Sequence, residues 1–255
     1  EKIFVFINGE CRSGYHVFCS SETNGPREKT FFEELVPFIE KQYRVDKNPR
    51  TRFLMGQSSG AWAGLWLLIN YPDRFGGAYV AAPDPVDFRE FIGTNIYEKN
   101  ANMYVDSKGG VKYLLGKISV EDFTGMDRIA GRGEQMDSFD AAFSSRNGDG
   151  QPRRLFDWET GAVDPGVAKS WERHDLSKLI SRLDRQKRKQ LKGKIHIYVA
   201  EDDDFGLAKP DQPGVCQECQ VCGDSPGTRV NPRDVYRDGF AFQEFQHPAA
   251  AVGSR

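Results

Sequence analysis

The chain has 255 residues and a mass of 28.8 kDa, enough for one α/β domain with a sizeable core. Its 35 basic and 37 acidic residues give a formal charge of -2, so no global field attracts nucleic acid or an anionic membrane. Apolar residues make up 38%, and no apolar run approaches the roughly 20 residues that span a bilayer. These values favour a small-molecule partner and leave localisation and oligomeric state open.

The chain begins with a strand pattern and has no initiator methionine. Residues 3–7 read Ile-Phe-Val-Phe-Ile, which predicts an interior β-strand rather than a signal peptide. A chain that starts directly on such a strand indicates truncation at the N-terminus. Further on, Thr30 and Glu33 match a capping box, which predicts the start of a helix with one apolar stripe. Pro37 is expected to kink that helix.

The most informative motif is Gly-x-Ser-x-Gly at residues 56–60. Residues 52–55 before it predict a short buried strand, and residues 61–69 after it predict a buried helix. This context mounts the serine on a sharp turn, where a side chain at either glycine would meet neighbouring backbone. Ser58 is therefore the candidate nucleophile, and the backbone N–H of Ser59 is the candidate oxyanion-hole donor.

Strands and helices alternate along the first part of the chain and again near residue 200. Residues 77–81 predict a second strand, residues 176–191 a polar helix, and residues 194–200 an apolar strand. Such alternation predicts an α/β fold with a mostly parallel sheet and helices on both faces.

The stretch between these parts has a different composition. From residue 87 to residue 175 the pattern loosens into glycines, charges and scattered aromatics, which predicts an inserted cap that contains helices. We expect residues 1–86 to form the first part of the core and residues 176–255 the second, with an atypical tail from about residue 210. Some cap aromatics are candidates either for an acyl or aryl pocket or for the cap's own core: Tyr97, Tyr104, Phe123, Phe139 and Trp158.

A serine nucleophile needs a histidine to take its proton and an acid to orient that histidine. In the α/β-hydrolase arrangement the order along the chain is serine, acid, histidine. Asp203 is the candidate acid because it lies in the acidic cluster at 201–204, after the last predicted apolar strand; an exposed acidic loop is the alternative. His247 is the candidate base because it alone among the four histidines follows that cluster; a surface histidine without a role is the alternative.

The other three histidines lie earlier in the chain. His196 is in the middle of a predicted strand and His174 is at a predicted helix entry, so structural roles are expected for both. His16 lies on a loop and, with Gln57 of the Gly-x-Ser-x-Gly motif, is a candidate for lining a substrate pocket. A structural role is the alternative for His16.

A cysteine cluster near the C-terminus gives a competing signal. Cys216, Cys219 and Cys222 have the spacing of a thiolate site for zinc or an iron–sulfur cluster, but a fourth ligand is missing. Free or disulfide-paired thiols are the alternative, and the odd total of five cysteines leaves the redox compartment open. Because the cluster is one ligand short, no metal is expected; no Gly-rich phosphate loop is present, and no cofactor is expected either.

With these features the chain resembles the Putative esterase family of α/β-hydrolases, which includes esterase D, the enterochelin esterases and the mycolyltransferases. Besides residues 56–60, the motifs that carry the resemblance are Gly14-Tyr15-His16-Val17-Phe18, Asn24-Gly25-Pro26, Glu34-Leu35-Val36-Pro37, Tyr71-Pro72-Asp73-Arg74-Phe75, Asp84-Pro85-Val86-Asp87-Phe88-Arg89, Ser138-Phe139, Asp149-Gly150-Gln151-Pro152, Trp158-Glu159-Thr160-Gly161 and Leu191-Lys192-Gly193-Lys194. The resemblance implies Ser58 as nucleophile and Asp203 as triad acid, through a Gly-x-x-Asp-x-Phe-like pattern in which Ala200 replaces the glycine. The family's earlier strand and loop, which supply part of the oxyanion hole, and its Asp-His-like histidine context are not visible in this chain.

The expected function is that of a serine hydrolase that cleaves small carboxylic esters through an acyl-enzyme. Acyl transfer to another alcohol follows the same path with a different acceptor. The alternatives from other classes are a non-catalytic α/β-hydrolase-fold protein with an incomplete site and a metal-binding module at the cysteine cluster.

Overall fold

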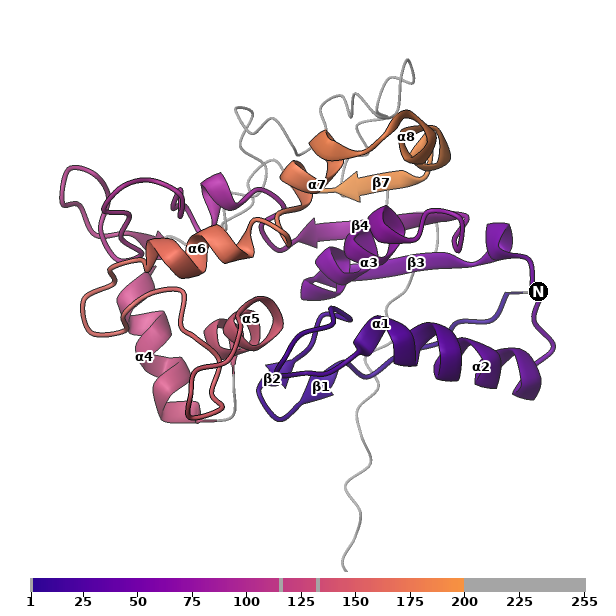
Figure 1. Ribbon diagram of the computed structural model, residues 1–255, viewed down its shortest axis with the longest axis horizontal. Coiled ribbons are helices and arrows are strands. Elements are labelled where there is room, and N and C mark those ends of the chain that lie inside the picture. Colours follow the sequence, from indigo (N-terminus) through magenta and orange to yellow (C-terminus); the bar gives the residue numbers. More distant parts are fainter. Residues whose placement is uncertain (1, 115–116, 132–133, 200–255) are drawn as a thin grey trace, which may run out of the picture.

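The core of the fold is a parallel sheet of three strands, β3 (Phe53–Ser58), β4 (Gly77–Pro83) and β7 (Ile195–Tyr198), in the order β3–β4–β7 (Figure 1). The computed structural model describes residues 2–114, 117–131 and 134–199. All three strands lie where the sequence predicts strands. Because both strand pairs are parallel, the carboxyl ends of β3 and β4 meet at one edge of the sheet.

The central helix α3 (Ser59–Asn70) follows β3 directly and packs on β3 and β4. Every residue from Ala61 to Ile69 is buried, as expected of a helix that is apolar all round. Gly64 of this helix faces the sheet, where a Cβ would lie 3.4 Å from the Val80 side chain, at van der Waals distance. The predicted strand, turn and helix around residues 56–60 are therefore confirmed, but the strand is not buried as predicted, since Phe53 and Met55 are 53% and 57% exposed.

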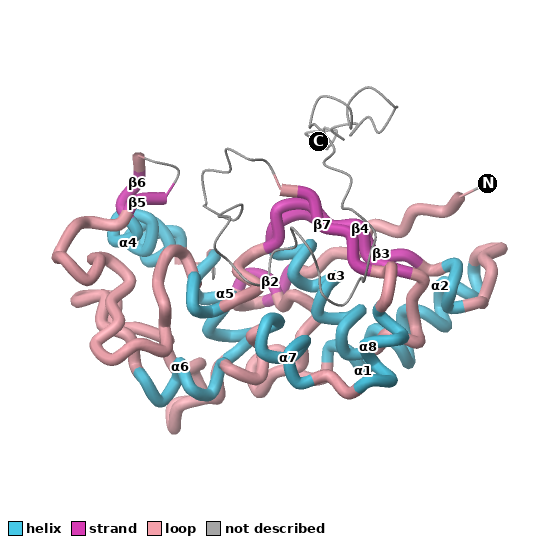
Figure 2. The backbone as a smooth tube through the Cα atoms, turned by 90° about the horizontal axis from the view of Figure 1, so that it is seen from above, coloured by secondary structure: helices cyan, strands magenta, loops and turns pink. Residues whose placement is uncertain are grey.

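Two further helices, α7 (Leu176–Arg182) and α8 (Arg185–Leu191), replace the single polar helix predicted for residues 176–191. The helix is interrupted between Arg182 and Arg185. The Asp184 side chain accepts a hydrogen bond from the Lys187 N–H and so caps the N-terminus of α8. Figure 2 shows α3, α7 and α8 on the same side of the strands.

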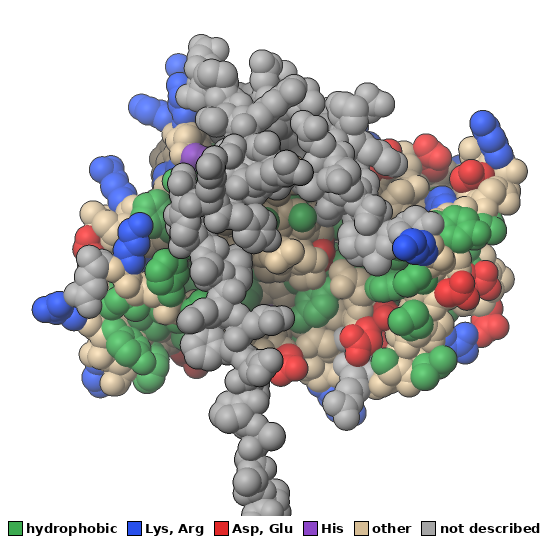
Figure 3. Space-filling model, turned by 180° about the vertical axis from the view of Figure 1, so that it is seen from behind, with side chains coloured by type: hydrophobic (Ala, Val, Ile, Leu, Met, Phe, Trp, Pro, Cys, Tyr) green, Lys and Arg blue, Asp and Glu red, His purple; other side chains and the backbone are tan. Residues whose placement is uncertain are grey.

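The opposite face of the sheet carries exposed apolar side chains. Phe53, Met55 and Tyr79 are 53%, 57% and 39% exposed; the first two alternate on β3 with partly buried residues, and Tyr79 lies between buried residues on β4. Figure 3 views the molecule from this side and shows hydrophobic side chains at the surface. Among the helices that the structure describes, α3, α7 and α8 thus cover one face, where the sequence predicts helices on both.

The first long helix is continuous but irregular. It consists of α1 (Arg27–Thr30), the π-helical turn η1 (Phe31–Leu35) and α2 (Val36–Gln42). The predicted capping box is wrong, because Thr30 has helical backbone angles and makes no capping hydrogen bond. The irregularity expected at Pro37 is the π-helical turn just before it, where the Val36 N–H reaches back to the Phe31 carbonyl.

The strand predicted for residues 3–7 is also wrong for the described structure. Residues 2–9 have no regular secondary structure, and the five apolar side chains from Ile3 to Ile7 are 39% to 91% exposed. Strand propensity forms a strand only where a neighbouring strand and a buried face are available. A short hairpin follows, formed by β1 (Glu10–Cys11) and β2 (Gly14–Tyr15).

Residues 87–175 contain helices, as the sequence predicts. These are α4 (Val120–Ala130), α5 (Gln135–Phe143) and α6 (Pro165–Trp171), together with the hairpin β5 (Tyr113–Leu114) and β6 (Ile118–Ser119) and the short 3-10 turn η3 (Phe88–Glu90); the turn η2 (Pro49–Thr51) precedes β3. Phe143 of α5 contacts Trp62 of α3 and Trp171 of α6, with ring centroids 4.9 and 5.1 Å away. This aromatic cluster joins residues 87–175 to the central helix in one core.

Within residues 87–175, Phe139 and Tyr104 belong to this buried core, being 2% and 6% exposed. Tyr97, Phe123 and Trp158 pack against it and are partly buried. Of the helices in the described part of the chain, none has the length and apolar character needed to cross a bilayer.

Candidate active site

Ser58 lies at a strained turn between β3 and α3. Its backbone angles are φ 51° and ψ -123°, a conformation that non-glycine residues rarely adopt. A Cβ at Gly56 would lie 2.3 Å from the carbonyl oxygen of Gly60, so this position requires glycine. The same prediction for Gly60 is wrong, since a Cβ there would meet no described atom within 4 Å. The turn at residues 56–60, called the elbow below, therefore depends on Gly56.

Asp84 is the group that contacts the elbow serines. It follows β4 directly, and the parallel pairing of β3 and β4 brings it beside Ser58. The Ser58 hydroxyl donates to Asp84 Oδ1 at 2.9 Å, and the Ser59 hydroxyl donates to Oδ2 at 2.5 Å. The Asp84 backbone N–H also donates to the Ser58 carbonyl oxygen at 3.3 Å. One residue thus contacts both serines of the motif.

The Asp84 carboxyl group is buried, with 7% of the residue exposed. Burial raises its pKa, because a charged carboxylate is poorly solvated there, while the hydrogen bonds from Ser59, Ser58 and Gln135 oppose that rise. Gln135, the first residue of α5, donates through Nε2 to Oδ2 at 3.4 Å. The site is therefore a desolvated acid held by three side-chain donors from separate elements.

Tyr15 of β2 lies near the same carboxyl group. Burial, and then the negative charge of Asp84, raise the pKa of its hydroxyl, which therefore stays protonated at neutral pH. That hydroxyl is buried and has no hydrogen-bond partner within the described structure. The Tyr15 ring packs edge-on against Phe139, with centroids 6.4 Å apart.

The structure brings together only part of the predicted site. Ser58 is exposed at the end of β3, and Ser59 is the first residue of α3, so its backbone N–H has no partner within the first turn of that helix. Asp203 and His247 lie outside the described residues. Asp84, Gln135 and Tyr15 are the additional residues of the site; Asp84 directly follows the strand after the elbow, and both Asp84 and Tyr15 lie in motifs that carry the family resemblance, whereas no such motif contains Gln135.

The two candidates for a substrate pocket have different surroundings. His16 is 5% exposed, and its Nδ1 accepts a hydrogen bond from the Phe18 N–H at 3.1 Å. Burial, and then the positive charge of Arg27, lower the pKa of His16 to about 4, so its ring is neutral at pH 7. Gln57 is exposed at the end of β3, in register with Ala81 of β4.

The remaining described histidines pack on aromatic rings. His196 of β7 stacks on Tyr79, with ring centroids 4.2 Å apart. His174 is 3% exposed, stacks on Phe143, and has its pKa lowered to about 3 by burial and then by Arg173. These contacts fit the structural roles expected of both.

No group of three or more His, Cys, Asp or Glu side chains in the described ranges is arranged to hold a metal ion. The cluster of Cys216, Cys219 and Cys222 lies outside those ranges. Cys11 and Cys19 are described and are not in a disulfide.

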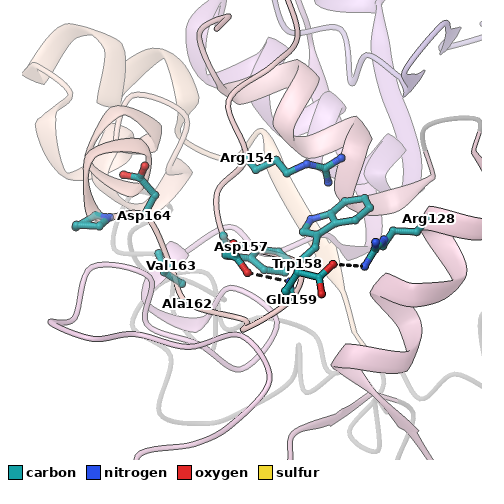
Figure 4. Close-up of a pocket in the computed structure, with 10 residues that line it drawn as sticks. Arg128, Arg154, Asp157, Trp158, Glu159, Ala162, Val163 and Asp164 are labelled. Atoms are coloured by element: carbon teal, nitrogen blue, oxygen red, sulfur yellow. Dashed lines mark hydrogen bonds and ion pairs between the residues drawn. The ribbon is translucent and has the colours of Figure 1, made fainter.

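A concave region away from the elbow lies between α4 and the loop before α6 (Figure 4). This open cavity has a volume of about 710 Å³, and Trp158, one of the aromatics expected to line an acyl or aryl pocket, lines it. The Arg154 guanidinium lies 3.5 Å above the Trp158 ring, and Arg128 pairs with Glu159 at 3.0 Å. Its charged groups therefore already have partners, and neither serine of the elbow lines it.

Comparison with known proteins places the elbow in a family context. The family described as Putative esterase matches residues 19–220, which include the elbow, β4 and Asp84. The chain belongs to this esterase family. A search of the curated proteins finds no match. Membership in the family supports an α/β-hydrolase-like fold and a hydrolase or esterase function.

Proposed function

We propose that this esterase-family protein hydrolyses carboxylic esters of small molecules with Ser58 as the nucleophile. The observation that supports this most directly is the backbone of Ser58, held at φ 51° between β3 and α3 in a chain of an esterase family. Such a turn lifts the hydroxyl out of the sheet edge, and Ser58 is exposed there.

The proposed reaction forms and breaks an acyl-enzyme. The Ser58 oxygen attacks the ester carbonyl carbon, the alcohol leaves with a proton, and water then releases the acid. His247 takes the Ser58 proton and returns it to the leaving alcohol, while Asp203 orients the imidazole ring. Residues 87–175 serve as the cap that selects the substrate.

The Ser59 N–H is the proposed oxyanion donor. It belongs to the first turn of α3, where unpaired N–H groups and the helix dipole favour negative charge. A donor of this kind is worth about 2.7 to 4 kcal/mol in the transition state. Acyl transfer to an alcohol other than water would use the same groups.

Labelling with a fluorophosphonate tests the nucleophile. We expect one equivalent of label on the folded protein and none on Ser58→Ala, measured by intact mass. Ser181→Ala is the matched control, because Ser181 is an exposed serine on α7, and it should label like the wild type. Folded wild-type protein that takes up no label, or label that persists in Ser58→Ala, would contradict the proposal.

Variants of the remaining candidates test the proton path. His247→Ala and Asp203→Asn should label more slowly than the wild type by at least about a hundredfold and tenfold, respectively. A His247→Ala variant that labels at the wild-type rate would show that a different group takes the Ser58 proton.

A further inference from the structure

Asp84 holds Ser58 at two points. Its side chain accepts the Ser58 hydroxyl at 2.9 Å, and its backbone N–H donates to the Ser58 carbonyl at 3.3 Å. These contacts fix both the side chain and the peptide group of a residue whose backbone conformation is strained. A strained conformation persists only where its surroundings determine it, and Asp84 supplies two of those constraints.

The second carboxyl oxygen of Asp84 contacts the start of α3. Oδ2 accepts the Ser59 hydroxyl at 2.5 Å, and Ser59 is the first residue of α3. This contact ties the first residue of α3 to the end of β4. Asp84 therefore contacts both the nucleophile and the residue that carries the proposed oxyanion donor.

The three side-chain partners of Asp84 are more than folding stability requires. They come from the end of β3, the start of α3 and the start of α5, and they surround a carboxyl group with little solvent exposure. A buried acid costs folding free energy unless its hydrogen bonds compensate. A backbone donor would satisfy such an acid equally well, as the Leu155 N–H does for the buried Asp140 of α5.

We propose that Asp84 is a positioning residue of the active site: its backbone N–H holds the Ser58 peptide group and its carboxyl group holds Ser59, so that the Ser58 hydroxyl, once its proton turns from Asp84 to His247, can attack an ester. This inference rests on the proposed role of Ser58 as nucleophile. It adds the residue that follows β4 to a site for which the sequence proposes the elbow, Asp203 and His247 as the reacting groups.

The test compares Asp84→Asn and Asp84→Ala with the wild-type chain. The measurements are kcat and KM on p-nitrophenyl acetate and the maximal rate of fluorophosphonate labelling, each corrected for the folded fraction. We expect kcat and the labelling rate to fall about tenfold to a hundredfold, the loss typical of a hydrogen bond to a charged group, with KM little changed. A general loss of stability would instead lower the folded fraction and leave these corrected values unchanged.

Asp140→Asn is the matched control. Asp140 is also a buried aspartate, 5% exposed, but its hydrogen bond comes from the Leu155 backbone. Its substitution should change stability and leave the corrected kcat and labelling rate at wild-type values.

Ser59 variants separate the contact of Asp84 with Ser59 from its contacts with Ser58. Ser59→Ala removes the hydroxyl that donates to Asp84 and should lower kcat by about tenfold. Ser59→Thr keeps a hydroxyl at this position and should restore most of that loss. Equal activity of the alanine and threonine variants would mean that the Ser59 contact positions nothing.

The outcomes distinguish this inference from the proposed function. If the folded wild type is not labelled, the proposal for Ser58 fails. If the wild type is labelled through Ser58 but Asp84→Asn and Asp84→Ala label as fast or faster, Ser58 is the nucleophile and the role given to Asp84 is wrong.

Discussion

Two buried aspartates in this protein share the same burial and differ in their partners. Asp84 and Asp140 are 7% and 5% exposed, and burial raises the pKa of both, for Asp140 to about 8. Asp140 accepts a backbone N–H inside the core, whereas Asp84 accepts the hydroxyls of two serines at the elbow. Burial and a raised pKa therefore do not by themselves identify a functional acid; the groups that it contacts do.

The surroundings of the two acids differ in the same way. Every residue from Ser138 to Phe143 on α5 is buried, so Asp140 sits inside packed side chains. Asp84 lies next to the protein surface, because Ser58, whose hydroxyl it accepts, is exposed to solvent. Substitutions near Asp140 should therefore change the free energy of unfolding, and substitutions near Asp84 should change the reactivity of Ser58.

The largest effect is expected from Gly56→Ala at the elbow. The new Cβ would lie 2.3 Å from the Gly60 carbonyl oxygen, which is backbone and cannot turn aside. We expect a loss of about 3 kcal/mol or more in the free energy of unfolding and no fluorophosphonate labelling. Urea unfolding and intact mass measure both.

Gly60→Ala is the control for this substitution. A Cβ at Gly60 meets no described atom within 4 Å, and alanine is favoured over glycine in a helix such as α3 by up to about 1 kcal/mol. The variant should be as stable as the wild type or more stable. If Gly56→Ala and Gly60→Ala have the same free energy of unfolding, the close approach of Gly56 to the Gly60 carbonyl does not determine the elbow conformation.

Phe143→Ala should destabilise the core around α5, the surroundings of Asp140. Phe143 is 1% exposed and contacts Trp62 and Trp171, so its removal leaves a cavity in the core. We expect a loss of about 3 to 5 kcal/mol in the free energy of unfolding. The labelling rate of the molecules that remain folded should match the wild type; a large drop in that rate would mean that the core around α5 also controls the elbow.

The pH dependence of stability should report Asp140. Its pKa is raised from 3.8 to about 8, so between these values the folded chain holds a proton that the unfolded chain has lost. The stabilising contribution is full below 3.8, falls as pH rises, and is gone above about 8. His16 and His174 lose their protons near pH 6.5 only in the unfolded chain, and they add the same pH dependence to the wild type and to Asp140→Asn, so the difference between the two slopes reports Asp140.

The measurement is the free energy of unfolding between pH 6.5 and about 8. In the wild type it should fall by up to about 1.4 kcal/mol per pH unit more than in Asp140→Asn, which has no proton to lose. Equal slopes would show that Asp140 does not bind a proton in the folded state at these pH values.

The smallest effect is expected from Tyr15→Phe. The Tyr15 hydroxyl is buried without a hydrogen-bond partner in the described structure, and the ring packs on Phe139. The neighbouring side chains of Ser59 and Gln135 keep their hydrogen bonds to Asp84 when the hydroxyl is removed, so stability should stay the same or rise by up to about 1 kcal/mol. Thermal unfolding measures this; a loss above about 1 kcal/mol would mean that the hydroxyl does form a hydrogen bond.

Much of the fold could be predicted where the signal is local. The helix at 61–69 is apolar on all sides and is buried, and the strands at 77–81 and 194–200 appear as β4 and β7. The prediction failed where local preference lacked a tertiary partner. Residues 3–7 have strong strand propensity, yet they are exposed and form no strand in the described structure.

The candidate site divides in the same way. Ser58 follows from five consecutive residues, because a sharp turn with a nucleophile has a short sequence pattern. Asp84 is 26 positions from Ser58, and Gln135 is 51 positions from Asp84, so no local pattern joins them. Asp203 and His247 stay predictions.

The sequence by itself determined the elbow, its strand and helix, and membership in an esterase family, since each depends on neighbouring residues or on the pattern of the whole chain. The tertiary structure decided which acid contacts the elbow. Parallel pairing of β3 with β4 places the two carboxyl ends side by side, and burial under α5 then leaves the Asp84 carboxyl group with serine and glutamine side chains as its partners.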